Sequence, residues 1–247
     1  MNILNNQIVS ISGGSQGIGF AIAERLGKQG AKISFCARNE TMLRAAEKSL
    51  QAAGIDCLAT RADVSRPKDV ERWFTETEKH FGPTTILVNN AGISGKGPFH
   101  TLSEAQWDAT MSVNCRGVFL CTKRALPAMI QAEKGRIFMI SSISSLYYRK
   151  GFSLYFATKW ALNGFAHCLA KEAQKHNIHV HILCPGMVET HFFESMGGRP
   201  HPPDHLYADP QVYAEQVEKI CRLPDNLDTL EFAILPSWQL QNFGVRR

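Results

Sequence analysis

The chain has 247 residues, of which 44% are hydrophobic and 20% charged, and its formal net charge is +5. This is the balance of a globular protein that can bury a large core. The basic residues are spread along the chain rather than gathered in runs, which argues against a nucleic-acid-binding arm. No apolar run approaches the roughly 18 residues of a membrane span, and the first residues lack the pattern of a signal peptide.

The chain has seven cysteines, an odd number, and no two of them form a C-x-x-C pair. A disulfide framework or a structural zinc site normally needs paired, closely spaced cysteines. We therefore expect reduced thiols and a cytoplasmic protein. The cysteines are Cys36, Cys57, Cys115, Cys121, Cys168, Cys184 and Cys221.

Short apolar segments alternate with longer helical patterns along most of the chain. Strands are predicted over 7–12, 32–37, 57–62, 85–90, 136–141 and 177–183, and helices over 19–29, 40–53, 65–82, 103–129 and 153–176. Strands that alternate with helices form βαβ units, in which the strands lie parallel. The sequence therefore predicts an α/β fold with a doubly wound parallel sheet of about seven strands and helices on both faces.

The alternation stops at 191–210, a segment with four prolines and two glycines. This composition disfavours a long regular element, so the segment is either an ordinary surface connection or a mobile substrate loop. Asp209 and Pro210 then have the pattern of a helix N-cap followed by proline in the first turn, which predicts a helix to about Arg222. A last strand is predicted over 230–235.

A glycine-rich turn, SGGSQGIG at 12–19, joins the first predicted strand to the first predicted helix. Glycines at 13, 17 and 19 would let the backbone turn sharply and approach a diphosphate, whose charge the N–H groups at the helix start favour. A tight turn without a ligand is the alternative. The place of the turn at the first strand–helix junction favours a nucleotide.

The choice of nucleotide depends on the end of the second predicted strand. An acidic residue there would bind a ribose 2′-hydroxyl, but the sequence has Ala37 followed by Arg38. A cation suits a 2′-phosphate, so NADP(H) is favoured over NAD(H). The alternative is that Arg38 is a solvated charge in a turn.

Further motifs follow along the chain. They are Asp63-Val64 after the third strand, NNAG at 89–92, Asn114, Ser142, Tyr155-x-x-x-Lys159, and Pro185-Gly186 with Thr190. Together with G-x-x-x-G-x-G at 13–19, they resemble the short-chain dehydrogenase/reductase family over residues 5–190. The resemblance implies one Rossmann-type domain over 1–247, and a homodimer or homotetramer formed through the helices at 103–129 and 153–176.

The resemblance also implies the roles of individual residues. The implied cofactor-binding positions are Gly13, Ser15, Gln16, Gly17, Ile18, Gly19, Arg38, Asp63, Val64, Asn90, Ala91, Gly92, Tyr155, Lys159, Pro185, Gly186, Val188 and Thr190. The implied catalytic positions are Asn114, Ser142, Tyr155 and Lys159. Some positions depart from the family pattern. Cys184 stands where asparagine is common, Ser144-Ser145 replaces a frequent Ala-Gly, and Gln16 stands where some NADP-dependent members have a basic residue. The C-terminus lacks the glycine-rich ending common in acyl-carrier-protein reductases of the family.

Tyr155 and Lys159 lie four residues apart in a predicted helix and so share a face. A free phenol has a pKa near 10, and we expect the charge of Lys159 to lower the pKa of Tyr155, as general acid catalysis requires. Ser142 would hydrogen-bond the substrate oxygen. Asn114 would disrupt its helix and bind a water that relays protons from Lys159; the alternative is a solvent-facing asparagine.

These residues need no metal, and His179 and His181, which could share one, have no evident third ligand. We expect an NADP(H)-dependent carbonyl reductase or alcohol dehydrogenase that acts on a small molecule, with no nucleic-acid or membrane partner. A 3-oxoacyl-thioester reductase and reductases of small ketones, sugars or steroids all fit the sequence. The alternative function is a non-enzymatic NADPH-binding sensor or scaffold, which the presence of Tyr155 and Lys159 disfavours.

Overall fold

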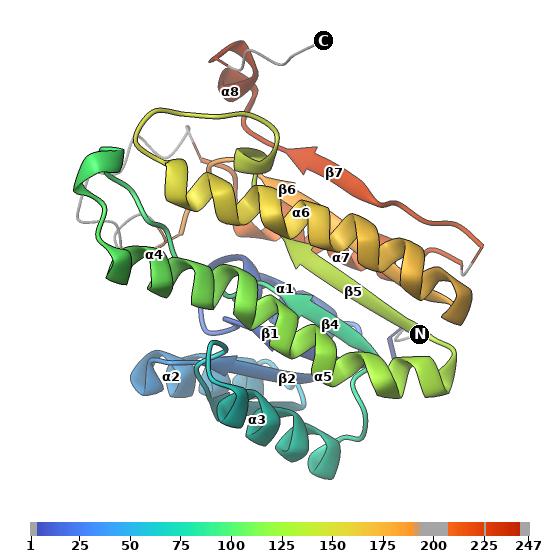
Figure 1. The fold of residues 1–247 in the computed structure, drawn as a ribbon. Helices are drawn as coiled ribbons and strands as arrows, with labels where there is room; N and C mark the ends of the chain where they lie inside the picture. The colour runs from blue at the N-terminus through green and yellow to red at the C-terminus, as the bar shows by residue number, and fades with distance from the viewer. Residues whose placement is uncertain (1–3, 191, 193–206, 225, 243–247) are drawn as a thin grey trace.

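The computed structural model describes residues 4–190, 192, 207–224 and 226–242. Its centre is a parallel sheet of seven strands in the order β3-β2-β1-β4-β5-β6-β7 (Figure 1). The strands are β1 (Ile8–Ser12), β2 (Lys32–Ala37), β3 (Cys57–Arg61), β4 (Ile86–Asn89), β5 (Gly135–Ile140), β6 (Ile178–Pro185) and β7 (Glu231–Ile234). The predicted doubly wound α/β fold is confirmed.

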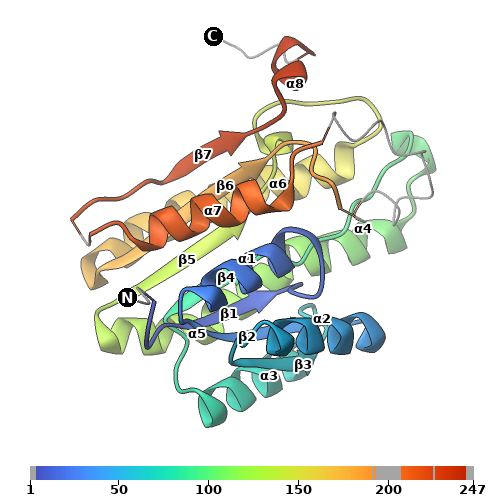
Figure 2. The same cartoon turned by 180° about the vertical axis from the view of Figure 1, so that it is seen from behind.

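Helices cover both faces of this sheet. One face carries α1 (Gly17–Lys28), α2 (Glu40–Ala52) and α7 (Pro210–Cys221), and the other carries α3 (Pro67–His80), α5 (Gly117–Ala132) and α6 (Ser153–Ala173), as Figures 1 and 2 show from opposite sides. The short α8 (Ser237–Asn242) follows β7. None of these described helices is long and apolar enough to cross a membrane.

The central strands are buried on both faces, which is why they are continuous apolar runs rather than alternating ones. Every residue of β1 and of β4 is buried. The few polar side chains inside are hydrogen-bonded: Trp73 Nε1 of α3 donates to Ser34 Oγ of β2 at 2.9 Å, and that hydroxyl also bonds Thr77 Oγ1 at 2.6 Å. Satisfied polar groups of this kind carry little burial penalty.

The helix predicted over 103–129 is not uniform. It begins with α4 (Glu104–Met111), which Ser103 and Gln106 cap reciprocally, and it continues through a π-helical turn at Ser112–Arg116 into α5. The expected local disruption at Asn114 is therefore confirmed. A π-helical turn adds one residue to the turn, and such turns are often found at functional sites.

The carboxyl-terminal elements largely follow the prediction. Asp209 caps α7, with its Oδ1 accepting from Gln211 N at 2.8 Å, and β7 is the edge strand beside β6. Most of the predicted substrate loop at 191–210 lies outside the described residues. The strand order reverses at β1: β2 and β3 lie on one side of it, and β4 to β7 lie on the other. Ligands of such sheets bind at the carboxyl ends of the strands beside this reversal of order.

Candidate active site

A cavity of about 420 Å³ opens at the carboxyl ends of the strands. It runs from the end of β2, past the turn after β1, to the loops that follow β4, β5 and β6. Every predicted site residue lines it except Gly19 and Asn114. The structure therefore brings together residues that lie up to about 175 positions apart along the chain, as far as from Gly13 to Thr190.

The glycine-rich turn needs its glycines for two different reasons. Gly13 and Gly17 have φ of +68° and +57°, in the left-handed region that side chains disfavour. A Cβ on Gly17 would also lie 2.9 Å from Thr190 Cγ2, and a Cβ on Gly19 would clash with the Gly13 carbonyl oxygen and the Asn90 side chain. Gly19 does not line the cavity, but its lack of a side chain lets the first turn of α1 pack closely against Gly13 and Asn90.

Hydrogen bonds from β4 hold this turn in place. Asn90 Nδ2 donates to Ser12 O at 3.0 Å and to Gly13 O at 2.8 Å, and Ser12 Oγ accepts from Asn90 N at 3.0 Å and Ala91 N at 3.1 Å. Ser12 was not among the predicted site residues. Its role depends on the pairing of β1 with β4, which the sequence did not specify.

Two charged residues mark the β2–β3 end of the cavity. Asp63 Oδ1 accepts from Ser65 N at 2.9 Å and from Ser65 Oγ at 2.7 Å. Burial works to raise the pKa of Asp63, but the Ser65 hydrogen bonds and the charges of Arg38 and Arg66 outweigh it, so the pKa lies below its usual value. Arg38 is exposed at the cavity rim. This end therefore presents one carboxylate and one cation to a ligand.

Ser142 follows β5 in extended conformation, at the start of the 3₁₀ turn Ile143–Ser145. Its Oγ accepts from Ser144 N at 3.1 Å, while its carbonyl accepts from Ser145 N at 2.9 Å and Ser145 Oγ at 2.6 Å. Because the backbone N–H occupies one lone pair of the hydroxyl, its hydrogen can still be donated into the cavity. The Ser145 hydroxyl thus satisfies a backbone carbonyl.

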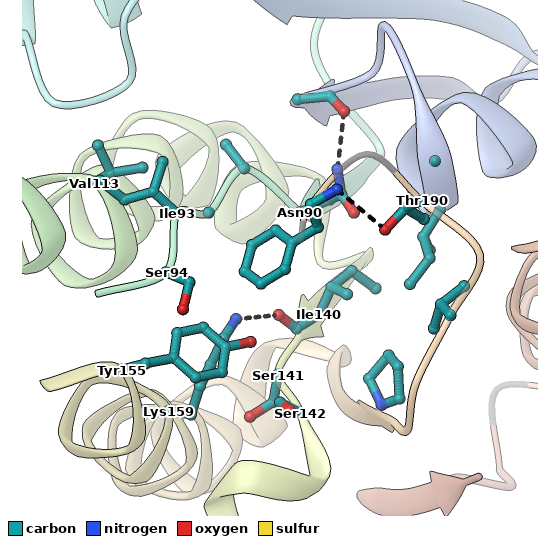
Figure 3. A pocket seen from close by; sticks show the side chains of 18 of the residues that line it. Asn90, Ile93, Ser94, Val113, Ile140, Ser141, Ser142, Tyr155, Lys159 and Thr190 are labelled. Atoms are coloured by element: carbon teal, nitrogen blue, oxygen red, sulfur yellow. Dashed lines mark hydrogen bonds between the residues drawn. The ribbon is translucent and has the colours of Figure 1, made fainter. Parts of the chain in front are cut away.

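Tyr155 and Lys159 lie on one face of α6 and point into the same space as Ser142 (Figure 3). Lys159 Nζ lies 5.6 Å from the centre of the Tyr155 ring and donates to Ile140 O at 2.9 Å. The expected lowering of the Tyr155 pKa is wrong for this structure. Burial raises the pKa of Tyr155 well above 10 and outweighs the interaction with Ser142 that lowers it.

The same burial acts on Lys159 in the opposite direction. Removing an ammonium from water disfavours its charged form, and burial lowers the pKa of Lys159 to about 8. The lysine, rather than the tyrosine, therefore has the pKa that lies near neutral pH. Desolvation has a larger effect on both pKa values than the attraction between the two side chains that their spacing predicts.

Asn114 is buried in the π-helical turn, so the alternative of a solvent-facing asparagine is wrong. Its Oδ1 accepts from Ile93 N at 2.8 Å, and its Nδ2 donates to Ile93 O at 2.8 Å and to Thr158 Oγ1 at 3.0 Å. The side chain thus joins the loop after β4 to α6, one residue before Lys159. Asn114 supports the site from behind the cavity wall.

Cys184 lies at the carboxyl end of β6, fully buried. Its Sγ lies 3.5 Å from Ser145 Oγ and 3.7 Å from Glu231 Oε1. Asn163 Nδ2 donates to the same Glu231 oxygen at 2.9 Å, and Asn163 Oδ1 accepts from Ser141 Oγ at 2.6 Å. A polar network therefore runs from the edge strand β7 to the end of β5, behind the candidate catalytic serine.

The sequence analysis missed several residues that line the cavity. They are Asn39, Met42, Ser94, Arg149, Phe156, Met187 and Gln239. Gln239 comes from α8, and its Oε1 accepts from Met187 N at 2.8 Å. Tyr147, Phe152 and Phe192 also line it. No local pattern marks the missed residues, because their place depends on how distant loops pack.

His179 and His181 both contact Asp228, at 3.0 Å and 3.3 Å from their Nδ1 atoms. They lie on β6, away from the cavity. Within the described part of the chain, no group of three histidine, cysteine, aspartate or glutamate side chains is arranged to hold a metal ion. All seven cysteines are free thiols.

The short chain dehydrogenase family model matches residues 7–199. The 2-(S)-hydroxypropyl-CoM dehydrogenase 3 of Xanthobacter autotrophicus is 34% identical over 189 residues, which are 76% of this chain and 74% of the relative. The human 3-oxoacyl-(acyl-carrier-protein) reductase is 36% identical over 185 residues, 75% of this chain and 77% of the relative.

Solved structures agree with these matches. An alcohol dehydrogenase from the archaeon Thermococcus sibiricus, solved as a complex with 5-hydroxy-NADP, has a TM-score of 0.86 and 27% identity, and the match covers 94% of this chain and 97% of that one. The chain belongs to the short-chain dehydrogenase family and is an oxidoreductase. The family resemblance stated from the motifs is confirmed.

Proposed function

We propose that this protein is an NADP(H)-dependent oxidoreductase that interconverts a carbonyl and a hydroxyl group on a small molecule. The observation that carries the proposal is that Ser142, Tyr155 and Lys159 point into one cavity (Figure 3), which the glycine-rich turn also lines. When bound, NADP(H) would supply or accept the hydride.

The residues at the turn fit a dinucleotide. Side chains at Gly13 and Gly17 would strain the backbone, and a side chain at Gly19 would collide with Gly13 and Asn90. The three glycines therefore leave space for a ligand beside the start of α1. Backbone N–H groups there would hold the diphosphate. Arg38 would bind the 2′-phosphate, and Asp63, kept ionised, would accept a hydrogen bond from the adenine amine.

We assign the proton chemistry to three side chains. Ser142 donates a hydrogen bond to the substrate oxygen and holds it beside Tyr155. The phenol of Tyr155 is protonated at neutral pH and would donate its proton to the oxygen when a carbonyl is reduced. Burial raises its pKa and so weakens it as an acid. Lys159, with a pKa of about 8, carries a proton that it can exchange near neutral pH.

Asn114 would complete the route by which the proton is replaced. A Cβ built on Gly92 would lie 3.5 Å from Asn114 Oδ1 and 3.9 Å from Lys159 Nζ, so the two side chains approach the same small space. A water placed there would have polar partners on both sides. We therefore propose that Asn114 positions a water between Lys159 and solvent, besides fixing residue 93.

The relatives suggest two substrate chemistries, a 3-oxoacyl thioester and a secondary alcohol on a thioether. Aromatic side chains at the substrate end, among them Phe152, Phe156 and Phe192, support a substrate with an apolar part. The proposed direction is carbonyl reduction by NADPH.

We also propose that the protein acts as a dimer or tetramer in the cytoplasm. Trp107 of α4, Phe119 of α5 and Trp160 of α6 are exposed by 48%, 48% and 53%, which supports contact between copies through these helices. Seven free thiols favour a reducing compartment.

The test is Tyr155→Phe, assayed with NADPH against ketones, aldehydes and 3-oxoacyl thioesters. We expect kcat to fall by about 10²–10⁴-fold, because the substitution removes the proton donor, while NADPH still binds. Tyr148→Phe is the matched control, since Tyr148 lies in the neighbouring loop and is 78% exposed. Retention of activity in Tyr155→Phe would refute the assignment.

A further inference from the structure

Two loops border the substrate end of the cavity, one after β4 (93–102) and one after β5 (141–152), and we call them the substrate loops. They are joined by the hydrogen bond from Gly97 N to Gly151 O, at 2.9 Å. Their sequences contain Lys96, Arg149 and Lys150 but no aspartate or glutamate. These two loops therefore carry a net positive charge.

Arg149 is the cation of these loops that lines the cavity itself. Its guanidinium lies 5.4 Å from the centre of the Phe152 ring, which in turn lies 6.1 Å from the Phe156 ring. Tyr147 closes the same wall, with its ring 5.2 Å from Phe156. Arg149 thus stands at the end of an aromatic wall that begins next to the candidate proton donor, Tyr155.

No carboxylate within the described part of the chain forms an ion pair with Arg149. Among the described residues that line the cavity, the one acidic side chain is Asp63, at the opposite end. An arginine at the rim of an active site, stacked on an aromatic ring and with no ion-pair partner among the described residues, is well placed to bind an anion from solution.

The expected cofactor does not account for this charge. Its 2′-phosphate would lie at Arg38, after β2, whereas Arg149 lies in the loop after β5. These two strands are separated by β1 and β4 in the sheet, and neighbouring strands lie about 4.8 Å apart, so their ends are roughly 14 Å apart. Arg149 therefore lies at the substrate end, away from the site expected for the 2′-phosphate.

We propose that the substrate of this enzyme carries an anionic group, a carboxylate, sulfonate or phosphate, which Arg149 binds while the carbonyl lies at Tyr155 and Ser142. The planar guanidinium offers paired N–H donors to such a group. Phe152, Phe156 and Tyr147 would contact the carbon chain between the two ends. This inference rests on the proposed carbonyl reductase function and adds the class of its substrate.

The experiment compares matched anionic and neutral substrates. Oxo acids from 4-oxopentanoate to 8-oxononanoate are assayed beside their methyl esters, with NADPH, and oxoalkyl phosphates are assayed beside the parent alcohols to distinguish carboxylate from phosphate. For at least one chain length, we expect kcat/KM for the anion to exceed that for its neutral partner by about tenfold or more. Added KCl should reduce this preference, because salt screens the exposed charge.

Arg149→Gln should bring the anion-to-neutral ratio of kcat/KM close to one, mainly through the KM of the anion. Lys150→Gln is the matched control, because Lys150 is the adjacent exposed cation and does not line the cavity, and it should keep most of the preference. Binding of NADPH to both variants shows that they are folded.

Two results would overturn the inference while the proposed function stands: neutral substrates turned over as well as their anions at every chain length, or a preference for anions that Arg149→Gln leaves unchanged. If NADPH binds but no member of any pair is reduced, and ketones, aldehydes and thioesters also fail, the proposed function is refuted and this inference with it.

Discussion

The two ends of the cavity are built in different ways. At the β1–β4 end, the walls are strand ends and a glycine turn, and they are held by hydrogen bonds such as those from the Asn90 side-chain Nδ2 to the carbonyls of Ser12 and Gly13. At the substrate end, the walls are side chains on the loops after β4, β5 and β6. The backbone of the β1–β4 end determines the shape of ligand that fits there. At the substrate end, single substitutions in the loops can change which ligand binds without disturbing the sheet.

The candidate catalytic residues lie between these two regions of the cavity. Ser142 lies two residues after the end of β5, and Tyr155 and Lys159 belong to the first two turns of α6. They are therefore held by the rigid sheet and helix, although they face the variable loops. This arrangement keeps the proton chemistry constant while the substrate changes.

Among substitutions at the β1–β4 end, Gly19→Ala should have the largest effect. Its new Cβ would collide with backbone at Gly13, which cannot move without opening the turn. We expect the free energy of unfolding to fall by about 1–3 kcal/mol and NADPH affinity to fall at least about tenfold. Chemical denaturation and fluorescence titration measure the two effects.

Gly164→Ala is the control for this substitution. Gly164 is exposed in α6, and a Cβ there meets no atom within 4 Å. Alanine in the middle of a helix is more stable than glycine by about 0.5–1 kcal/mol, so this variant should be slightly stabilised and should bind NADPH normally. Equal behaviour of the two variants would show that the turn tolerates a side chain.

Arg38→Asp tests the recognition of the cofactor at the adenine end. The substitution replaces the cation expected at the 2′-phosphate, so Kd for NADPH should rise by about tenfold to a hundredfold, while Kd for NADH changes little. Lys48→Gln, an exposed cation of α2 that does not line the cavity, should change neither. Similar effects of Arg38→Asp on both cofactors would contradict the assigned role.

The pH dependence of activity tests the role of Lys159, which lies between the two ends of the cavity. Lys159 is cationic below its pKa of about 8 and loses its proton as the pH rises through that value. We expect kcat/KM for carbonyl reduction to fall above about pH 8, approaching tenfold per pH unit. A profile that stays flat to pH 10, with NADPH binding unchanged, would show that the ammonium is not required.

Much of this protein follows from local sequence. The alternation of strand and helix patterns predicts the doubly wound sheet, because each helix connects two parallel strands and packs against the sheet. The glycines at 13 and 17 predict a turn because only glycine takes positive φ without strain. The spacing of Tyr155 and Lys159 places both on one helix face, since four residues make about one turn.

Tertiary structure alone decided the rest. Burial raises the pKa of Tyr155 and lowers that of Lys159, and desolvation depends on every neighbour rather than on the four-residue spacing. Gln239 and Arg149 reach the cavity only because α8 and the loop after β5 pack beside it. The sequence by itself determined which reactive groups are present and which of them share an element. Packing determined how they are charged and what surrounds them, because both depend on segments brought together from distant parts of the chain.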